Sequence, residues 1–311
     1  METSRFRAMN SDILLVAQGT HARIAEGFDE ALQFIQASED RFSLFSGESE
    51  LSELNRSAGM RFQVSPDLFS VLAHAQRLFV MTGGIFDPSI LPDLRRVGYD
   101  RSMDLLRQSG AASLDESLPR VELPSFSGME LDERRGMILL PPGMTVDLGG
   151  IDKGWVAEQA ALILSEFSSA CAVNAGGDMF MVGLPDGEQH WLVGIQDPFQ
   201  PEINLTTLNV DPGALATSAV TKRVWQQGEK QRHHLIDPRT GEPAVTGWLS
   251  VTVIAPHAYE AEVFAKALLI AGRRESEEIA RNGCTQFSYL AVDHDRKIWG
   301  SKKSLEFKYV N

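Results

Sequence analysis

The sequence predicts an α+β fold in which largely antiparallel sheets pack against helices. Short apolar segments typical of β-strands occur at residues 9–17, 191–195, 203–210 and 249–255. Amphipathic segments typical of helices occur at 22–37, from residue 65 onward and at 259–271. The two kinds of segment do not alternate strictly, as they would in a parallel βαβ fold, and this irregular order favours antiparallel pairing.

Two of the predicted helices carry clear local signals. Between residues 22 and 37, apolar side chains recur on one face, at Ile24, Phe28, Leu32 and Ile35. The next helix begins at Ser65-Pro66-Asp67, which supplies an N-cap hydroxyl, a proline in the first turn and an acidic residue near the positive end of the helix dipole. We expect its buried face to carry Leu68, Leu72, Ala75, Leu78 and Phe79.

Length and charge limit the possible functions. A chain of 311 residues that is 43% apolar can bury the core of one large domain or of two closely joined ones. Its net charge of −13 disfavours a nucleic-acid binder, because phosphate backbones are bound by clustered Lys and Arg. No segment reaches the roughly 20 apolar residues that span a bilayer. The apolar run 13–17 is too short for a signal peptide, so we expect a cytoplasmic protein, or a periplasmic one if an export signal has been removed.

Two further features bear on organisation. Residues 109–133 are acidic, rich in Ser and interrupted by Pro, which predicts an irregular crossover or surface insertion and marks the place of any internal boundary. Cys171 and Cys284 lie far apart and lack the spacing of metal ligands. We therefore expect them to be small buried residues rather than a disulfide or a zinc site.

Two glycine turns are candidate ligand sites. DLGGIDKG at 147–154 and NAGGD at 174–178 each follow an apolar β-type run, at 144–146 and 172–173. The first also precedes a helical pattern from residue 156, and a turn that opens a helix leaves backbone N–H groups free for a phosphate. Such turns also close tight corners without any ligand. Neither matches GxGxxG or GxxxxGK[ST], which counts against a Rossmann or P-loop site.

The segment RHHLIDPRTGEP at 232–243 is the third candidate. Asp237-Pro238 and Gly241 predict a fixed turn beside two histidines, and histidine can transfer protons near neutral pH. The segment could equally be a histidine-bearing surface turn.

The order of these and other motifs resembles the ApbE family of FAD:protein FMN transferases. The matching segments are FSLFSGESELSELNR at 42–56, TGGIFDPSILP at 82–92, DLGGIDKG, NAGGD, WLVGIQDP at 191–198, LATS at 215–218, RHHLIDPRTG and SVTVIAP at 250–256. The resemblance extends from about Met9 to Gly272. It implies a single T-fold-like α+β body over 1–311 that binds FAD in a cleft. Such a protein cleaves the FAD pyrophosphate, attaches FMN through a phosphoester to Thr or Ser of a target protein, and releases AMP.

The resemblance also implies roles for individual residues. His234 matches the family's catalytic histidine and would accept the proton of the acceptor hydroxyl, while His233 would lie along the flavin. Gly149 and Gly150 would face the pyrophosphate. Adenosine would contact Ile85, Phe86 and Asp87, whose carboxylate can accept hydrogen bonds. Met9, Phe45 and Trp155 match positions that pack against the nucleotide, although each could equally belong to the core.

The expected Mg²⁺ site departs from the family pattern. Family members hold the ion with a carbonyl of the glycine turn and with Asp and Thr of a later helix. Here Asp152 replaces an alanine, Glu262 the Asp and Lys266 the Thr. Three arrangements are possible: Glu262 and Lys266 form an exposed ion pair; Lys266 replaces the metal, held by Glu262 and Asp152; or Glu262, Asp152 and water bind a displaced divalent ion. The alternative function is therefore an FAD-binding protein that has lost metal-dependent transfer. The sequence does not identify the acceptor or the oligomeric state.

Overall fold

The computed structural model describes residues 1–99, 101, 105–106, 120, 122, 124–282 and 287–301. Residues 109–119 of the predicted insertion and Cys284 lie outside the described residues. Cys171 is a free, buried cysteine, as expected.

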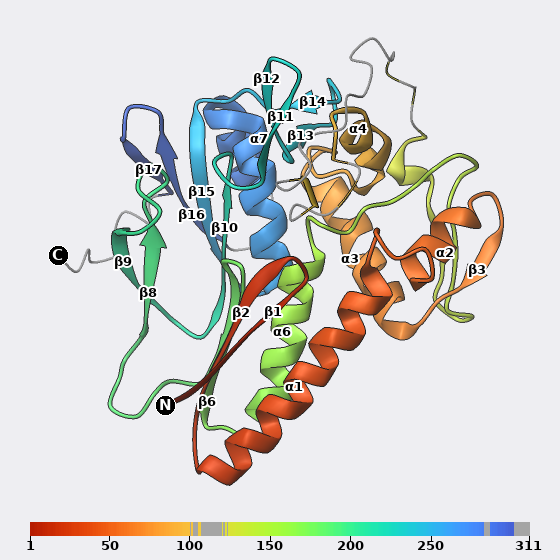
Figure 1. Cartoon of the computed structure of the whole chain (residues 1–311). Coiled ribbons are helices and arrows are strands. Elements are labelled where there is room, and N and C mark those ends of the chain that lie inside the picture. The colour runs from red at the N-terminus through yellow and green to blue at the C-terminus, as the bar shows by residue number, and fades with distance from the viewer. Residues whose placement is uncertain are drawn as a thin grey trace.

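An eight-stranded sheet forms the centre of the molecule (Figure 1), and all its neighbouring strands are antiparallel, in the order β1-β2-β6-β7-β10-β15-β16-β17. The strands are β1 (Glu2–Ala8), β2 (Ser11–Gln18), β6 (Ala170–Ala175), β7 (Asp178–Val182), β10 (Gly213–Ala219), β15 (Trp248–Ala255), β16 (Ser288–Asp293) and β17 (Ile298–Gly300). The predicted α+β class with largely antiparallel sheet is confirmed.

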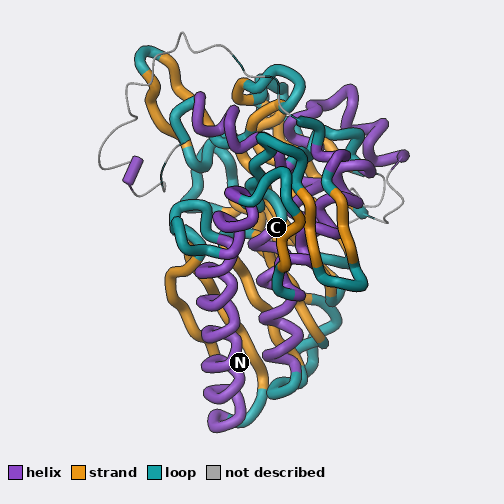
Figure 2. The backbone as a smooth tube through the Cα atoms, turned by 90° about the vertical axis from the view of Figure 1, so that its right-hand side faces the viewer, coloured by secondary structure: helices purple, strands orange, loops and turns teal. Residues whose placement is uncertain are grey.

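Three long helices cover one face of this sheet: α1 (His21–Phe42), α6 (Asp152–Ser165) and α7 (Ala258–Asn282). In Figure 2 the long helices and the strands run along the same length of the molecule. The predicted apolar face of α1 is buried through Ile24 and Ile35. At Gly272 the backbone of α7 leaves helical geometry, with φ 69°. The opposite face of the sheet packs against the hairpin of β8 (Trp191–Gln196) and β9 (Asn204–Val210), so the core has three layers.

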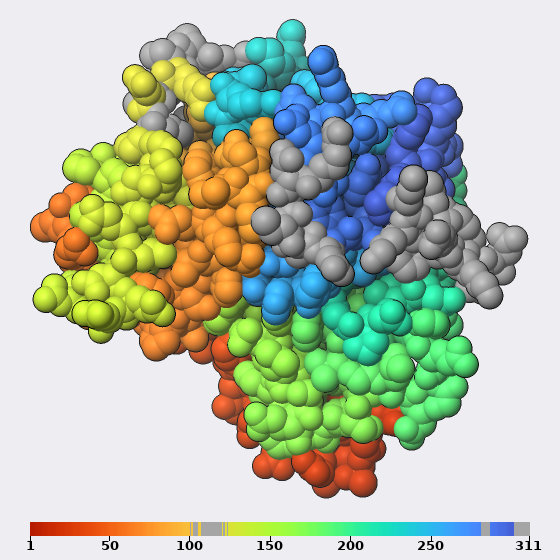
Figure 3. Space-filling view, turned by 180° about the vertical axis from the view of Figure 1, so that it is seen from behind, coloured from red at the N-terminus to blue at the C-terminus, as the bar shows by residue number. Residues whose placement is uncertain are grey.

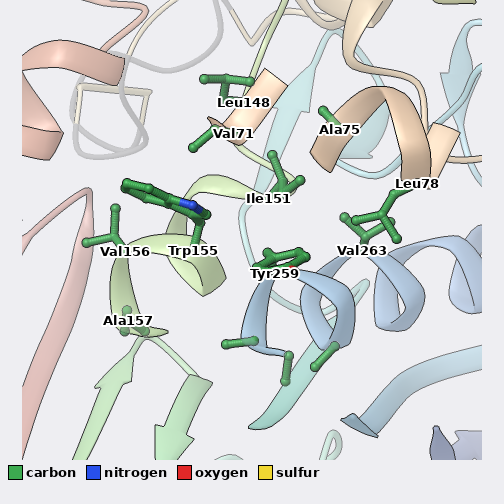
Figure 4. Close-up of a cluster of buried hydrophobic side chains, with 14 of the residues drawn as sticks. Val71, Ala75, Leu78, Leu148, Ile151, Trp155, Val156, Ala157, Tyr259 and Val263 are labelled. Atoms are coloured by element: carbon green, nitrogen blue, oxygen red, sulfur yellow. The ribbon is translucent and has the colours of Figure 1, made fainter. Parts of the chain in front are cut away.

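A second group of short elements packs against the end of the helical layer. It contains α2 (Glu50–Arg56), α3 (Pro66–Met81), η1 (Pro88–Ile90), α4 (Leu91–Arg96), η2 (Phe126–Gly128) and a sheet of β3 (Arg61–Gln63), β5 (Met137–Leu139) and β4 (Glu130–Asp132). The predicted Ser65 cap is confirmed, since its hydroxyl accepts the Leu68 N–H at 3.3 Å. Figure 3 shows α3 (orange) between the segment near residue 130 (yellow) and α7 (blue). Figure 4 shows their shared core, in which Val71 and Leu78 of α3, Ile151 just before α6, Trp155 in the first turn of α6 and Val263 of α7 converge.

The structure corrects the start of one predicted strand and two further local predictions. The predicted strand at 9–17 begins only at Ser11, because Met9 and Asn10 have φ of 52° and 53° and form the turn of a hairpin with β1. Residues 144–146 form no strand; the Asn55 side chain instead bonds both backbone polar groups of Val146, at 2.7 and 3.0 Å. The end of the 109–133 segment is regular rather than irregular, because η2 buries Phe126 and β4 pairs with β5.

Two small hairpins complete the described chain. They are β11 (Val224–Gln227) with β12 (Lys230–His233), and β13 (Ile236–Asp237) with β14 (Glu242–Pro243). They carry the two-histidine segment to the end of the sheet where α6 begins (Figure 1). No helix within the described ranges is long and apolar enough to cross a bilayer.

Candidate active site

Three parts of the chain meet at a cleft: the glycine turn 147–150, the segment 85–90 and the loop that carries His234, within residues 232–243. Nine of the predicted site residues line it: Met9, Phe45, Ile85, Phe86, Asp87, Gly149, Gly150, Asp152 and His234. These residues come from five separate parts of the chain, so the fold brings the motifs together as their collinear order implied. The apolar rings of Phe42 and Tyr99 also line the cleft and give it a surface suited to a flat aromatic ligand.

Two predicted ligand-contacting residues do not line this cleft. Trp155 is 4% exposed and packs edge-on against Phe42 at 5.8 Å, so the structure places it in the core, behind a ring that does face the cleft. His233 is fixed by its own loop: Nε2 lies 3.1 Å from the Ala244 carbonyl, and Nδ1 accepts the Leu235 N–H at 3.3 Å. With both nitrogens used and its pKa lowered by burial, His233 is neutral and anchors the loop.

His234 has different chemistry from its neighbour. Its Nδ1 is buried and has no hydrogen-bond partner within the described part of the chain. Burial first, and then the positive charges of Arg223 and Lys266, hold the His234 pKa well below the ordinary value of 6.5. The imidazole is therefore uncharged at neutral pH and has a lone pair ready to accept a proton.

An ionic network holds the loop that carries His234. Arg96 donates to the Glu242 carboxylate at 2.7 Å and to the Gly241 carbonyl at 2.6 Å, and Arg232 donates to the other oxygen of Glu242 at 2.6 Å. These two cations lower the Glu242 pKa against the opposing effect of burial. Gly241 has φ 71°, and a Cβ there would lie less than 3.0 Å from Asp93, so only glycine closes this turn without strain.

The glycine turn opens α6 as predicted. Asp147 accepts the Gly149 N–H at 2.9 Å, and α6 begins at Asp152. A Cβ on Gly150 would lie less than 3.0 Å from the Lys266 ammonium. Glycine at this position leaves room for the end of the Lys266 side chain, and the turn lines the cleft, where a ligand can reach it.

The predicted ligands of a divalent ion are already bound to other groups. Glu262 is 3% exposed, and its oxygens accept from the Lys153 ammonium and from the Gly154 N–H, the latter at 2.8 Å. Lys153 also pairs with Asp178 at 3.1 Å. Burial alone would lower the Lys153 pKa, but Glu262 and Asp178 raise it above its usual value. The possible exposed ion pair between Glu262 and Lys266 is therefore wrong, because Glu262 is buried and binds Lys153 instead.

Lys266 itself lies against the glycine turn, where its ammonium donates to the Gly149 carbonyl at 3.0 Å. Asp152 is half-buried, its Oδ1 is shielded from solvent and has no partner among the described groups, and burial raises its pKa to about 7. No three His, Cys, Asp or Glu side chains of the described residues are grouped as metal ligands. The donor set does not fit Mg²⁺, which needs hard oxygen ligands free to coordinate it, because both Glu262 oxygens and the Gly149 carbonyl already accept from other groups. The prediction of Asp152 and Glu262 as metal ligands is not supported.

A wider groove of about 1000 Å³ adjoins the cleft. It runs past the β1–β2 turn, the NAGGD turn and β10, and six residues line both spaces: Asn10, Gly149, Lys153, Arg223, His234 and Lys266. His234 therefore stands at the junction of two openings. This arrangement gives each of two reactants its own access to the same imidazole.

Lys153, Asp178 and Arg223 also line the cleft or the groove and were not predicted from the sequence. The first two lie inside the glycine motifs, so charged residues within those motifs were an available signal. Arg223 lies in none of the sequence motifs. Its backbone has φ 49°, a strained conformation for a residue with a side chain, and this turn points the chain into the junction between cleft and groove.

The antiparallel fold places a neutral histidine, His234, where the cleft and the groove meet. The protein therefore has room for a nucleotide-like ligand in one space and a second reactant in the other. The model of the ApbE family matches residues 9–290, and the chain belongs to this family. A curated relative, the FAD:protein FMN transferase of Treponema pallidum, is 27% identical over 279 residues, covering 84% of this chain and 75% of the relative. The transferase of the same name from Salmonella typhimurium is 26% identical over 272 residues, covering 85% and 77%.

Solved structures show the same fold. The ApbE protein of Thermotoga maritima superposes with a TM-score of 0.82 at 24% identity, covering 98% of each chain. The flavin transferase ApbE of Vibrio cholerae superposes with a TM-score of 0.78 at 21% identity, covering 99% of each chain. The predicted ApbE architecture is thus confirmed.

Proposed function

We propose that the chain is an FAD:protein FMN transferase, an enzyme that moves FMN from FAD to a hydroxyl of another protein and releases AMP. One observation carries the proposal: in a member of the ApbE family, a neutral His234 lies at the junction of a nucleotide-like cleft and a second groove. Curated relatives over more than four fifths of the chain are named for this activity.

The geometry supports the following division of labour. FAD occupies the cleft, with its pyrophosphate toward the Gly149–Gly150 turn and its rings against the apolar lining. Arg223 and Lys266 both line this junction and offset the negative charge that grows on the phosphate oxygens.

The acceptor enters through the wider groove, and a Thr or Ser of that protein presents its hydroxyl to His234. His234 takes the proton as the hydroxyl oxygen attacks the phosphorus of the FMN half. The new P–O bond forms, the bond to the bridging oxygen breaks, AMP leaves with the electron pair of that bond, and the proton passes from His234 to water.

The test compares the wild-type chain with His234→Ala. AMP is measured by chromatography after incubation with FAD and a co-expressed acceptor protein, and covalent flavin on the acceptor is measured by in-gel fluorescence. We expect FAD binding to survive in the variant and AMP release to fall by about 100-fold or more. Release at the wild-type rate would rule out His234 as the base.

The second candidate is an FAD-binding protein without transfer, favoured by the poor fit of the site to Mg²⁺. It predicts that FAD saturates the wild-type chain while no AMP appears with any acceptor. The same two measurements therefore separate the candidates.

A further inference from the structure

We infer that the ammonium of Lys266 supplies, at the Gly149–Gly150 turn, the positive charge that a divalent cation would otherwise bring to the FAD pyrophosphate, so that transfer by this chain needs no metal ion. The inference rests on the proposed function and adds to it the identity of the charge carrier.

The carboxylate that would hold a metal is already occupied by other groups. Both oxygens of Glu262 are committed, one to the Lys153 ammonium and one to the Gly154 N–H. The Asp178 carboxylate also contacts the Lys153 ammonium, at 3.1 Å. This pairing is buried, so binding a metal through Glu262 would leave the Lys153 charge poorly compensated away from water.

Lys266 lies at the glycine turn with its ammonium in reach of a ligand in the cleft. The Lys266 ammonium has three N–H donors, and one of them donates to the Gly149 carbonyl at 3.0 Å. Gly150 lacks the Cβ that would collide with it, so the turn has room for the lysine. Lys266 lines both the cleft and the groove, and its remaining donors are available to phosphate oxygens.

The positive charge of Lys266 is only partly compensated by the protein. Burial and the neighbouring cations Lys153 and Arg223 disfavour the charged form of Lys266, against the partial compensation of Glu262. A pyrophosphate carries negative charge into this position and relieves that cost. A divalent cation in the same place would add to the repulsion instead.

The experiment measures FAD affinity by fluorescence and AMP release by chromatography, each in excess EDTA and in Mg²⁺. It uses the wild-type chain, Lys266→Met, which keeps the length of the side chain, and Lys266→Arg, which keeps the charge. Lys297→Met, which removes an exposed lysine in the β16–β17 turn, controls for the loss of one charge.

We expect EDTA to change wild-type FAD affinity and AMP release less than twofold. Lys266→Met should weaken FAD binding at least about tenfold in either medium, with Arg restoring part of the loss and Lys297→Met showing none. Wild-type AMP release that requires Mg²⁺ would overturn the inference while leaving the proposed function intact.

Absence of AMP in both media would instead refute the proposed function, and the binding data would still decide the role of Lys266. Equal FAD affinity of Lys266→Met and the wild type in EDTA would overturn that role. The wild-type comparison needs no variant, so it stands even if Lys266→Met does not fold.

Discussion

Glu262→Gln tests how strongly the buried charges beneath the cleft hold the fold together. The change keeps the size of the side chain and the acceptor for the Gly154 N–H, but it removes the negative charge that Lys153 contacts. Removing one partner of a buried ion pair costs about 3–5 kcal/mol, because the other charge is left uncompensated. Asp178 still lies 3.1 Å from Lys153, so we expect the lower limit, about 3 kcal/mol.

The assay is urea unfolding followed by tryptophan fluorescence, with the free energy of unfolding compared at equal slope. Glu130→Gln is the matched control: its carboxylate pairs with Arg61 at 2.8 Å, but the two side chains are 57% and 45% exposed. Exposed pairs contribute about 0–1 kcal/mol, so this variant should hardly change stability. Equal losses for both variants, or a loss under about 1 kcal/mol for Glu262→Gln, would refute the argument from burial.

Four further predictions concern stability and the pH dependence of AMP release. Asn55→Leu should lower the free energy of unfolding by about 2–4 kcal/mol in urea, because both polar backbone groups of Val146 lose their partner. Gly154→Ala should cost about 2–3 kcal/mol in the same assay, since its Cβ would collide with the backbone of α7. AMP release requires neutral His234, whose pKa is depressed, so the rate should hold from pH 8 to about 6.5 and fall only below it. Because Arg223 helps to lower that pKa, Arg223→Met should move the acidic limb to higher pH, and an unmoved limb would contradict this assignment.

Much of the fold could be predicted because its signals are local. The Ser65-Pro66-Asp67 start fixes a helix through contacts within one turn, and the buried face of α1 repeats with helical period. The strand expected at 144–146 failed for the opposite reason. Its apolar pattern is that of a strand, but its backbone is bonded by Asn55, a residue 91 positions earlier. Nothing within a short window of sequence contains that contact.

The site could be predicted only as far as its motifs. Nine of the twelve predicted ligand, catalytic and metal residues line one cleft, because the motif order preserves an arrangement that composition alone would not reveal. Trp155 shows the limit: an aromatic residue beside a ligand motif can face the ligand or lie behind a ring that does, and sequence spacing does not separate the two. Its packing against Phe42 does.

The exposed Glu262–Lys266 ion pair was wrong because it paired charges along the helix instead of across the fold. Glu262 and Lys266 are four apart on α7, and helical spacing makes them neighbours. In the structure Glu262 binds Lys153, 109 positions earlier, and Lys266 binds the Gly149 carbonyl. The acidic residue thus neutralises one lysine and leaves the other facing the cleft. When only α7 is considered, Lys266 in place of a metal-ligand threonine suggests lost function. Because Glu262 binds Lys153, however, the Lys266 ammonium lies in the cleft at the place proposed for the pyrophosphate.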